Sequence, residues 1–298
     1  MNKIIKLDSV TQFNTERGQE TLHPLVTVLD QSKSKMIKMS RFFSGLYVVF
    51  LKEEKCADML YGRGHYDYQQ ETIIFIAPGQ LAGFDEEDTL IQPNGWALAF
   101  HPDFIHGTSL GKHIHNYHFF LYSIQEALHV SEREKSDLLD CFYKIQRELV
   151  RSIDRHSKKL VISNIELLLN YCERFYDRQF ITREHVNRDI LTRFESLVDN
   201  YFTSDKPAMI GLPTVAYCAE ELHLSPKYFG DLVKKETGQS AQEYLQNKII
   251  DAAKERMFDA GKSISEIAYG MGFKYPQHFA RLFKQRVGKT PQEYRLMN

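Results

Sequence analysis

The stretch KSISEIAYGMGFKYPQHFARLFKQRVGKTPQEYR, from Lys262 to Arg295, decides the fold of the C-terminal part of the chain. Ser263 stands before an apolar run and Glu266 follows three residues later, which is the pattern of a capping box at the start of a helix. Gly272 suits the left-handed conformation that ends a helix, because it has no side chain to clash. A second helix is expected to begin near Pro276. The stretch therefore predicts a helix-turn-helix.

The second helix has two chemically different sides. Its apolar side carries Phe279, Leu282, Phe283 and Val287. Its other side carries cationic and amide side chains, namely Lys274, Gln277, His278, Arg281, Lys284 and Gln285. Because a major groove about 12 Å wide admits one α-helix, we expect this helix to lie in a DNA groove with its polar side toward the bases.

Three segments of this stretch resemble the signature region of the AraC/XylS-type transcription regulators: ISEIAYGMGF, YPQHFARLFK and GKTPQEYR. The match is long and patterned, so it is far more specific than a lone helix-turn-helix. The resemblance implies two helix-turn-helix units in the C-terminal domain and a cupin-like N-terminal domain that senses an effector. A small helical protein-interaction domain is the alternative interpretation of these helices.

The composition is that of an ordinary globular protein, with 43% hydrophobic and 26% charged residues. The net charge of the 298 residues is −1, but residues 262–298 hold seven Lys and Arg against two Glu, a net charge of +5, which leaves −6 for the rest. A local excess of cations favours phosphate binding. The four cysteines are widely spaced, which argues against a disulfide framework or a zinc site. The apolar runs are too short to span a bilayer, so we expect a cytoplasmic protein without membrane contact.

A second copy of the motif occurs earlier in the chain. SPKYFGDLVKKETG, from Ser225 to Gly238, parallels YPQHFARLFKQRVG, from Tyr275 to Gly288. We therefore expect two helix-turn-helix units, at about 212–238 and 262–288. A connecting helix from about Ser240 to Met257 would be about 25 Å long. Such a helix could place the two units in successive major grooves, about 34 Å apart.

The two recognition helices offer different side chains to DNA. In the second unit, Gln277 and Arg281 lie one helical turn apart and suit adenine and guanine edges, respectively. In the first unit, Asp231 can accept a hydrogen bond from cytosine but repels phosphate, so we expect less base contact there. The full set of candidate DNA contacts is Lys227, Tyr228, Asp231, Lys234, Lys274, Tyr275, Gln277, His278, Arg281, Lys284 and Gln285.

Residues 1–130 have the pattern of short strands separated by turns. Leu46–Glu53, Thr72–Gly79 and Gly95–Pro102 are rich in β-branched and aromatic residues and are bounded by Gly, Pro and Asn. Several such strands predict a barrel or jelly roll, and the last two segments are similar to the cupin-like barrel of AraC-type regulators. The fold class is then α+β with two domains: a β-barrel and helical segment, followed by an all-α double helix-turn-helix domain.

Histidines in the barrel raise the question of a metal site. A metal-dependent cupin needs a His-x-His and a carboxylate on neighbouring strands. His65 is a single histidine where that motif would have two. His113 and His115 form a His-x-His, but the segment around them has the composition of a turn and no acidic partner nearby. We therefore expect loop histidines, no metal and no other cofactor.

Apolar residues take on helical spacing between Ser131 and Phe175, where two amphipathic helices are expected. In the family that the chain resembles, helices at this place pair two subunits, so residues 131–178 are assigned to dimerisation. Covering the open side of the barrel is the alternative role. Residues 179–189 are charged and are expected to form a linker, and 190–298 to form the DNA-binding domain.

These features together predict a sequence-specific DNA-binding transcription regulator and not an enzyme. We expect an activator that responds to a small-molecule effector bound in the barrel. Its expected partners are double-stranded DNA, the effector and a second copy of the chain, and RNA polymerase is left open as a further partner. Two alternatives stay open: an effector-independent regulator whose barrel dimerises or binds a partner, and a metal-dependent cupin enzyme fused to a DNA-binding domain.

Overall fold

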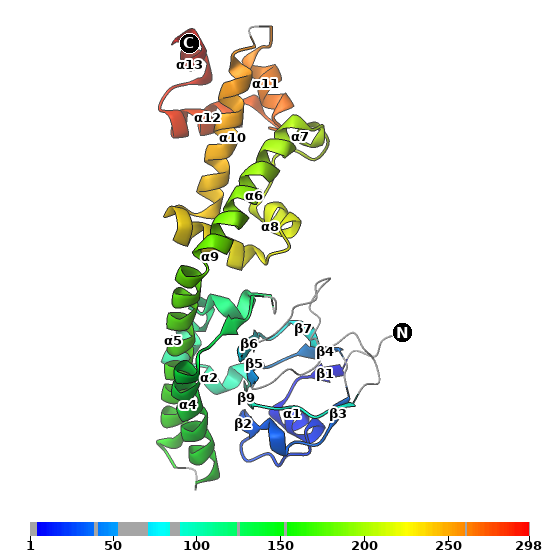
Figure 1. The fold of residues 1–298 in the computed structure, drawn as a ribbon, viewed down its shortest axis with the longest axis vertical. Coiled ribbons are helices and arrows are strands. Elements are labelled where there is room, and N and C mark those ends of the chain that lie inside the picture. The colour runs from blue at the N-terminus through cyan, green and yellow to red at the C-terminus, as the bar shows by residue number, and fades with distance from the viewer. Residues whose placement is uncertain are drawn as a thin grey trace. The chain divides into compact units, whose positions relative to one another are not determined.

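The chain divides into two compact units, Met1–Thr182 and Arg183–Asn298. The N-terminal unit mixes strands and helices, whereas the described part of the C-terminal unit consists of helices and turns (Figure 1). None of the described helices is both long and apolar enough to cross a membrane. The structure is a computed structural model, and it describes residues 5–38, 41–52, 71–83, 90–123, 126–151, 154–259 and 261–297.

The described helices fall into two groups, one in each unit. Those of the N-terminal unit are α1 (Val10–Glu16), α2 (Pro102–Ile105), α3 (Ser109–His113), α4 (Glu132–Val150) and α5 (Ser157–Thr182). Those of the C-terminal unit are α6 (Glu184–Thr203), α7 (Lys206–Ile210), α8 (Val215–Glu221), α9 (Pro226–Thr237), α10 (Ala241–Met257), α11 (Ile264–Gly270), α12 (Pro276–Val287) and α13 (Pro291–Met297).

The described strands form three separate sheets. The largest has the antiparallel order β10 (Leu128–His129), β6 (Thr72–Ile76), β5 (Tyr47–Lys52), β9 (Trp96–Phe100) and β2 (Val26–Asp30). A three-stranded sheet has the order β1 (Ile5–Leu7), β4 (Arg41–Ser44) and β7 (Leu81–Gly83), in which β1 and β4 are parallel. A two-stranded sheet joins β3 (Ile37–Lys38) and β8 (Leu90–Ile91).

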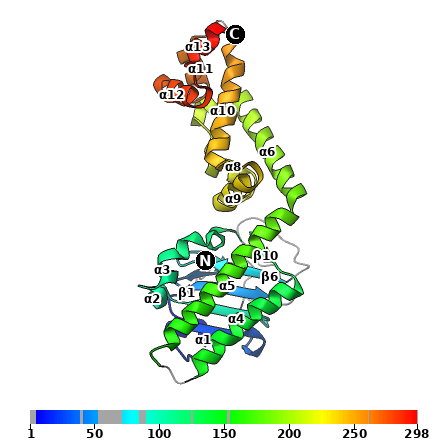
Figure 2. The same cartoon turned by 90° about the vertical axis from the view of Figure 1, so that its left-hand side faces the viewer.

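Both faces of the five-stranded sheet are buried. On one face, Phe50 of β5 belongs to the hydrophobic core, and its ring centroid lies 6.3 Å from that of Phe13 in α1. The other face is covered by α4 and α5 (Figure 2), where the ring of Trp96 in β9 lies 6.0 Å from that of Phe142 in α4. Because both faces are covered, the strands are nearly continuous apolar runs, as the sequence predicted for a strand-rich N-terminal part.

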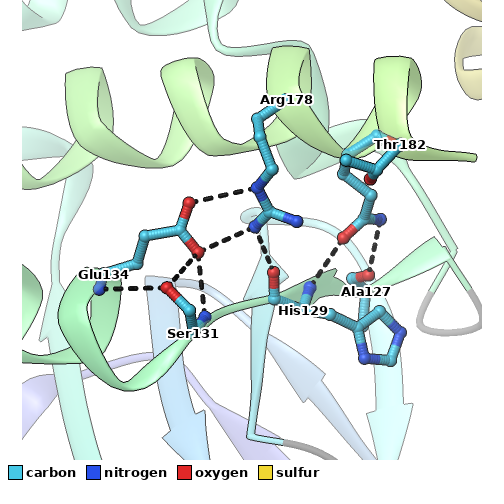
Figure 3. Close-up of polar contacts among 7 residues, drawn as sticks. Ala127, His129, Ser131, Glu134, Arg178 and Thr182 are labelled. Carbon is cyan, nitrogen blue, oxygen red and sulfur yellow. Dashed lines mark hydrogen bonds and ion pairs between the residues drawn. The ribbon is translucent and has the colours of Figure 1, made fainter.

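The outer edge of β10 bonds to a side chain instead of to another strand. The amide of Gln179, a buried residue of α5, accepts a hydrogen bond from His129 N at 2.8 Å and donates one to Ala127 O at 3.2 Å (Figure 3). A barrel closes only when both edge strands of a sheet find strand partners. The described residues therefore do not form a closed barrel, and the predicted barrel or jelly roll is not confirmed.

The predicted linker at 179–189 is helical. Helix α5 continues to Thr182 and α6 begins at Glu184, so the boundary between the two units falls at Arg183. Helix α5 extends past its predicted end because its last turns carry the buried Gln179 and Phe180. The C-terminal unit accordingly begins several residues before the predicted start at 190.

The histidines between residues 101 and 118 lie in short helices and turns. His101 caps α2, where its Nδ1 accepts a hydrogen bond from Asp103 N at 3.2 Å. His113 ends α3, and His115 lies in the following 3₁₀ turn, so the two do not share a strand face. Among the described residues, no three His, Cys, Asp or Glu side chains gather closely enough to hold a metal ion. His65 lies outside the described residues.

Candidate nucleic-acid interface

The second helix-turn-helix is formed by α11 and α12, as the sequence predicted. Ser263 accepts a hydrogen bond from Glu266 N at 3.2 Å, and the Glu266 carboxylate accepts one from Ser263 N at 2.7 Å, which completes the capping box of α11. Gly272 follows α11 with a φ of 88°, in the region where a side chain is strained. The chain then turns into α12, whose first residue is Pro276.

Helix α12 is held by its aromatic side. Phe279 and Phe283 are fully buried with ring centroids 5.7 Å apart, and Phe279 also lies 5.2 Å from Phe273 in the turn. Arg286 ties α12 to α10 by donating from Nη2 to Gln246 Oε1 at 2.5 Å. These contacts leave the opposite side of α12 free to face a ligand.

The predicted DNA contacts of the second unit are all exposed. They are Lys274, Tyr275, Gln277, His278, Arg281, Lys284 and Gln285. The side chains of Gln277 and Arg281 lie one turn apart, and neither hydrogen-bonds nor pairs with any group in the described part of the chain. Their amide and guanidinium donors are therefore available to acceptors outside the protein.

The first helix-turn-helix is formed by α8 and α9. Ser225 caps α9 by accepting a hydrogen bond from Tyr228 N at 3.3 Å, and Pro226 occupies the first helical position, as predicted. Gly238 ends α9 in the left-handed conformation, with a φ of 73°. The turn between α8 and α9 contains His223 with a φ of 59°, at the place that Gly272 holds in the second unit.

The outer side of α9 differs from that of α12. Lys227 and Asp231 form an ion pair at 3.6 Å, which partly neutralises both charges. Lys234 is exposed. Tyr228 is only 5% exposed, so its ring packs into the unit and cannot reach a base edge, and it leaves the set of candidate contacts. The period of the helix alone did not show this, because the inward stripe of α9 is wider than expected.

Helix α10 lies between the two units and is buried on more than one side. Leu245, Ile249, Ile250 and Ala253 are all at most 3% exposed. Helix α9 packs near the start of α10, and α12 lies toward its other end (Figures 1 and 2). The connecting helix that the sequence predicted therefore holds both recognition helices.

An ion pair joins α10 to α6, the first helix of the C-terminal unit. The Glu195 carboxylate of α6 accepts hydrogen bonds from the hydroxyl of Tyr244 and from Lys248 Nζ, the latter at 2.9 Å. These two bonds hold the pKa of Glu195 below its ordinary value, and the bond from Tyr244 has the larger effect of the two. Burial, and then the bond to Glu195, raises the pKa of Tyr244 to about 12. Sequence spacing gave no sign of this group, because Glu195 is 49 positions from Tyr244.

Comparisons with known proteins point to the same part of the chain. Residues 218–297 match the family model of a helix-turn-helix domain. A segment of 82 residues is 29% identical to the uncharacterized HTH-type transcriptional regulator YobQ of Bacillus subtilis, covering 28% of this chain and 34% of YobQ. A segment of 110 residues is 30% identical to the bifunctional transcriptional activator/DNA repair enzyme AdaA of the same organism, covering 37% of this chain and 47% of AdaA. The chain thus spans between about a third and a half of the length of these relatives.

Among solved structures, the C-terminal domain of AraT, a response regulator from Geobacillus stearothermophilus, is 27% identical. The likeness covers 37% of this chain and 85% of that one, with a TM-score of 0.32. The match of residues 218–297 to the family model shows a helix-turn-helix domain of the AraC type in the C-terminal unit, and the curated relatives named above are transcription regulators.

Proposed function

We propose that this chain, which carries a C-terminal helix-turn-helix domain of the AraC type, is a sequence-specific DNA-binding transcription regulator that reads DNA chiefly with α12. The observation that carries the proposal is the exposed, unengaged pair Gln277 and Arg281 on a helix anchored by Phe279 and Phe283. An amide and a guanidinium one turn apart suit hydrogen bonds to adjacent bases in a major groove. The relatives' names support the same class of function.

The remaining exposed cations suit the DNA backbone. Lys274 lies in the turn before α12 and Lys284 lies on α12, one on each side of the pair in sequence, and Lys234 is exposed on α9. Such side chains position a protein on the duplex without reading its sequence. Helix α9 contributes less base contact in this proposal, because Lys227 and Asp231 already pair with each other.

A mobility-shift series with the full chain across salt concentrations tests the proposal. Affinity is expected to fall steeply with salt, because each neutralised phosphate releases counterions. Arg281→Ala should cost about 1–3 kcal/mol and relax specificity at one base pair, whereas Lys284→Ala should weaken all sequences alike and lower the salt slope by about one. Arg133→Ala, which removes an exposed arginine from α4, is the control for charge loss. If the three variants show the same affinity, sequence specificity and salt slope, then α12 does not read bases.

The N-terminal unit is proposed to sense a small-molecule effector and to form a homodimer through α4 and α5. Dimerisation is supported by apolar side chains that these helices expose, among them Tyr143, Leu160 and Leu167, which are 51%, 49% and 39% exposed. Leu167→Glu should shift the chain from dimer to monomer in analytical ultracentrifugation, while Arg133→Ala should not. A monomeric wild-type chain would contradict this part of the proposal.

The proposed regulator is a cytoplasmic activator that is not an enzyme, and contact with RNA polymerase stays open. The alternative of an effector-independent regulator predicts that no metabolite in a broad screen shifts the thermal stability, because a bound ligand stabilises by mass action. A metal-dependent cupin enzyme predicts stoichiometric iron, zinc or manganese in the purified protein, which elemental analysis would detect.

A further inference from the structure

We propose that Arg256, at the end of α10, is a positioning residue that fixes the orientation of the two helix-turn-helix units and thereby the spacing of the two DNA segments that they bind. This proposal rests on the proposed DNA-binding function. It adds that the connecting helix is not the sole link, because a polar bracket and a backbone contact also tie the second unit to α6 and to the end of α7, which precede the first unit.

The polar bracket is the guanidinium of Arg256. Its Nη1 donates to the carbonyl of Gly270 at 2.7 Å, and its Nη2 donates to the carbonyl of Phe202. Gly270 is the last residue of α11, and Phe202 lies in the last turn of α6. Carbonyls at the C-terminal end of a helix lack partners within the helix and carry partial negative charge, so a cation between them is favoured. One side chain on α10 therefore joins the ends of two further helices.

The backbone contact lies beside this bracket. Gly211 follows α7 just before the first unit, and Gly272 lies in the turn between α11 and α12 of the second unit. A Cβ on Gly272 would lie 2.7 Å from the carbonyl carbon of Gly211 and 2.9 Å from the carbonyl oxygen of Pro207. The Gly211 carbonyl is itself fixed, because Tyr201 of α6 donates its hydroxyl to it at 2.7 Å. The turn of the second unit thus lies main chain to main chain against the end of α7, just before the first unit.

Together these contacts oppose rotation of one unit relative to the other. A single helix between two units could bend or let its ends pivot. The Arg256 bracket holds α11 to α6, which packs on α8 and α9 of the first unit. The Gly211–Gly272 contact holds the turn between α11 and α12 to the residue just before the first unit. A pair of recognition helices fixed in this way binds two grooves with little ordering cost, which is the advantage of preorganisation.

Rigidity of this kind has a consequence on DNA. Two base pairs inserted between the bound segments turn one segment about 70° around the axis relative to the other, since one turn holds about 10 base pairs. A rigid pair of units cannot follow this rotation, whereas a loosened pair can. The expected sign of a positioning role is therefore a change in tolerance for spacing, which a loss of fold stability alone would not produce.

The test uses the full chain and the genomic DNA fragment that the wild type binds, with the two segments mapped by footprinting. Copies with one or two inserted base pairs are compared. Arg256→Gln removes both charged hydrogen bonds, and Arg256→Lys keeps the charge but can reach only one carbonyl. Lys254→Gln is the matched control, because it removes a cation from the same helix whose ion pair is with Asp251 three residues away.

The wild type and Lys254→Gln should lose at least about 30-fold in affinity on insertion of two base pairs, since their units cannot reorient. Arg256→Gln should bind the natural spacing about 10-fold more weakly and lose less than about 5-fold on insertion, because its units must be ordered on binding. Arg256→Lys should fall between them. If Arg256→Gln loses the same factor of affinity at every spacing, or loses no affinity at any spacing, the proposal is wrong.

A second measurement separates this proposal from the DNA-binding function. Spin labels at Lys234→Cys and Gln285→Cys, both on exposed positions of the recognition helices, report the distance between α9 and α12 in the full chain carrying Cys56→Ser. The wild type should give a narrow distance distribution and Arg256→Gln a broader one. If Arg256→Gln gives the same distance distribution as the wild type, the positioning role is wrong, even if the protein binds DNA. If Arg256→Gln broadens the distribution but the wild type binds no DNA, only the proposed function is wrong.

Discussion

The guanidinium of Arg178 holds the carboxylate of Glu134 through two parallel hydrogen bonds, Nε to Oε1 at 3.1 Å and Nη2 to Oε2 at 2.9 Å (Figure 3). The same Nη2 donates to the carbonyl of His129 in β10 at 2.7 Å. Glu134 also accepts from Ser131 N at 2.8 Å, as the second half of the capping box of α4. The last turns of α5, which lead directly to the C-terminal unit, are thereby fixed to the start of α4 and to the edge of the main sheet.

Removing the charge of Glu134 should weaken the N-terminal unit. Glu134→Gln leaves a guanidinium that is only 38% exposed without its carboxylate, and we expect a loss of about 1–3 kcal/mol in the free energy of unfolding. Trp96, the single tryptophan of the chain, lies in β9 of this unit, so its fluorescence in a urea titration reports this unit alone. Glu132→Gln, an exposed carboxylate in the same helical turn, should stay within a few tenths of a kcal/mol. Equal losses in the two variants would show that the pairing with Arg178 contributes nothing.

The two positive-φ glycines of the second unit should respond differently to alanine. Gly272 and Gly288 have similar φ values, 88° and 82°, but a Cβ at Gly288 meets nothing within 4 Å, while one at Gly272 meets the main chain of Gly211. Gly288→Ala should cost about 1–2 kcal/mol from the left-handed backbone alone. Gly272→Ala should cost about 1–3 kcal/mol more, because the main chain at the end of α7 must shift. Hydrogen exchange of the α11 and α12 amides in a urea series measures the stability of this unit separately. Equal losses of stability in the two variants would mean that the main chain at Gly211 moves aside without cost.

The parts of the fold that could be predicted from the sequence depend on neighbours along the chain. Ser263 and Glu266 are three residues apart, Gly272 needs only its own missing side chain, and Pro276 sets its own φ. Such local preferences need no knowledge of the rest of the molecule. They identified both helix-turn-helix units and the exposed side of α12.

The parts that could not be predicted depend on partners far away in the chain. Gln179 bonds to His129, fifty positions earlier, and so completes the edge of a sheet that was expected to close into a barrel. Arg256 reaches the carbonyl of Phe202, 54 positions earlier. Tyr228 is buried, although helical spacing alone placed it on the outer side of α9. Tertiary contacts decide these features, and one sequence does not encode them in any short pattern.

The strained turn of the first unit is a site where stability can be gained. His223 has a φ of 59° at the place where the second unit has a glycine. His223→Gly should stabilise the first unit by about 0.5–1 kcal/mol, because relief of about 1–2 kcal/mol of left-handed strain exceeds the entropy cost of glycine, about 0.5–1 kcal/mol. His223→Ala, which keeps a Cβ, should give no gain. We expect hydrogen exchange of the α8 and α9 amides to slow in His223→Gly and not in His223→Ala. If both variants gain stability, the cause is removal of the imidazole and not relief of backbone strain.

Acid should weaken the contact between α6 and α10. The hydrogen bonds from Tyr244 and Lys248 hold the pKa of Glu195 below its ordinary value of 4.5. A carboxyl whose pKa is lower in the folded state stabilises the fold above its unfolded pKa, and this contribution disappears as the pH falls through the folded value. The stability of the C-terminal unit should therefore decline below about pH 4.5 more steeply in the wild type than in Glu195→Gln.

Tyr244→Phe should reduce the same pH dependence, because it removes the hydrogen bond that lowers the pKa of Glu195 most. Glu255→Gln, an exposed carboxylate on α10, should leave it as in the wild type. Hydrogen exchange of the α6 and α10 amides between pH 3 and pH 7, corrected for the intrinsic rate at each pH, measures the effect. If Glu195→Gln and Glu255→Gln lose stability in acid as steeply as the wild type, then the pKa of Glu195 is the same in the folded and unfolded states. The bonds from α10 would then not stabilise its charge. If Glu195→Gln and Tyr244→Phe reduce the loss of stability in acid and Glu255→Gln does not, then the charged group between α6 and α10 helps to hold α6 on α10.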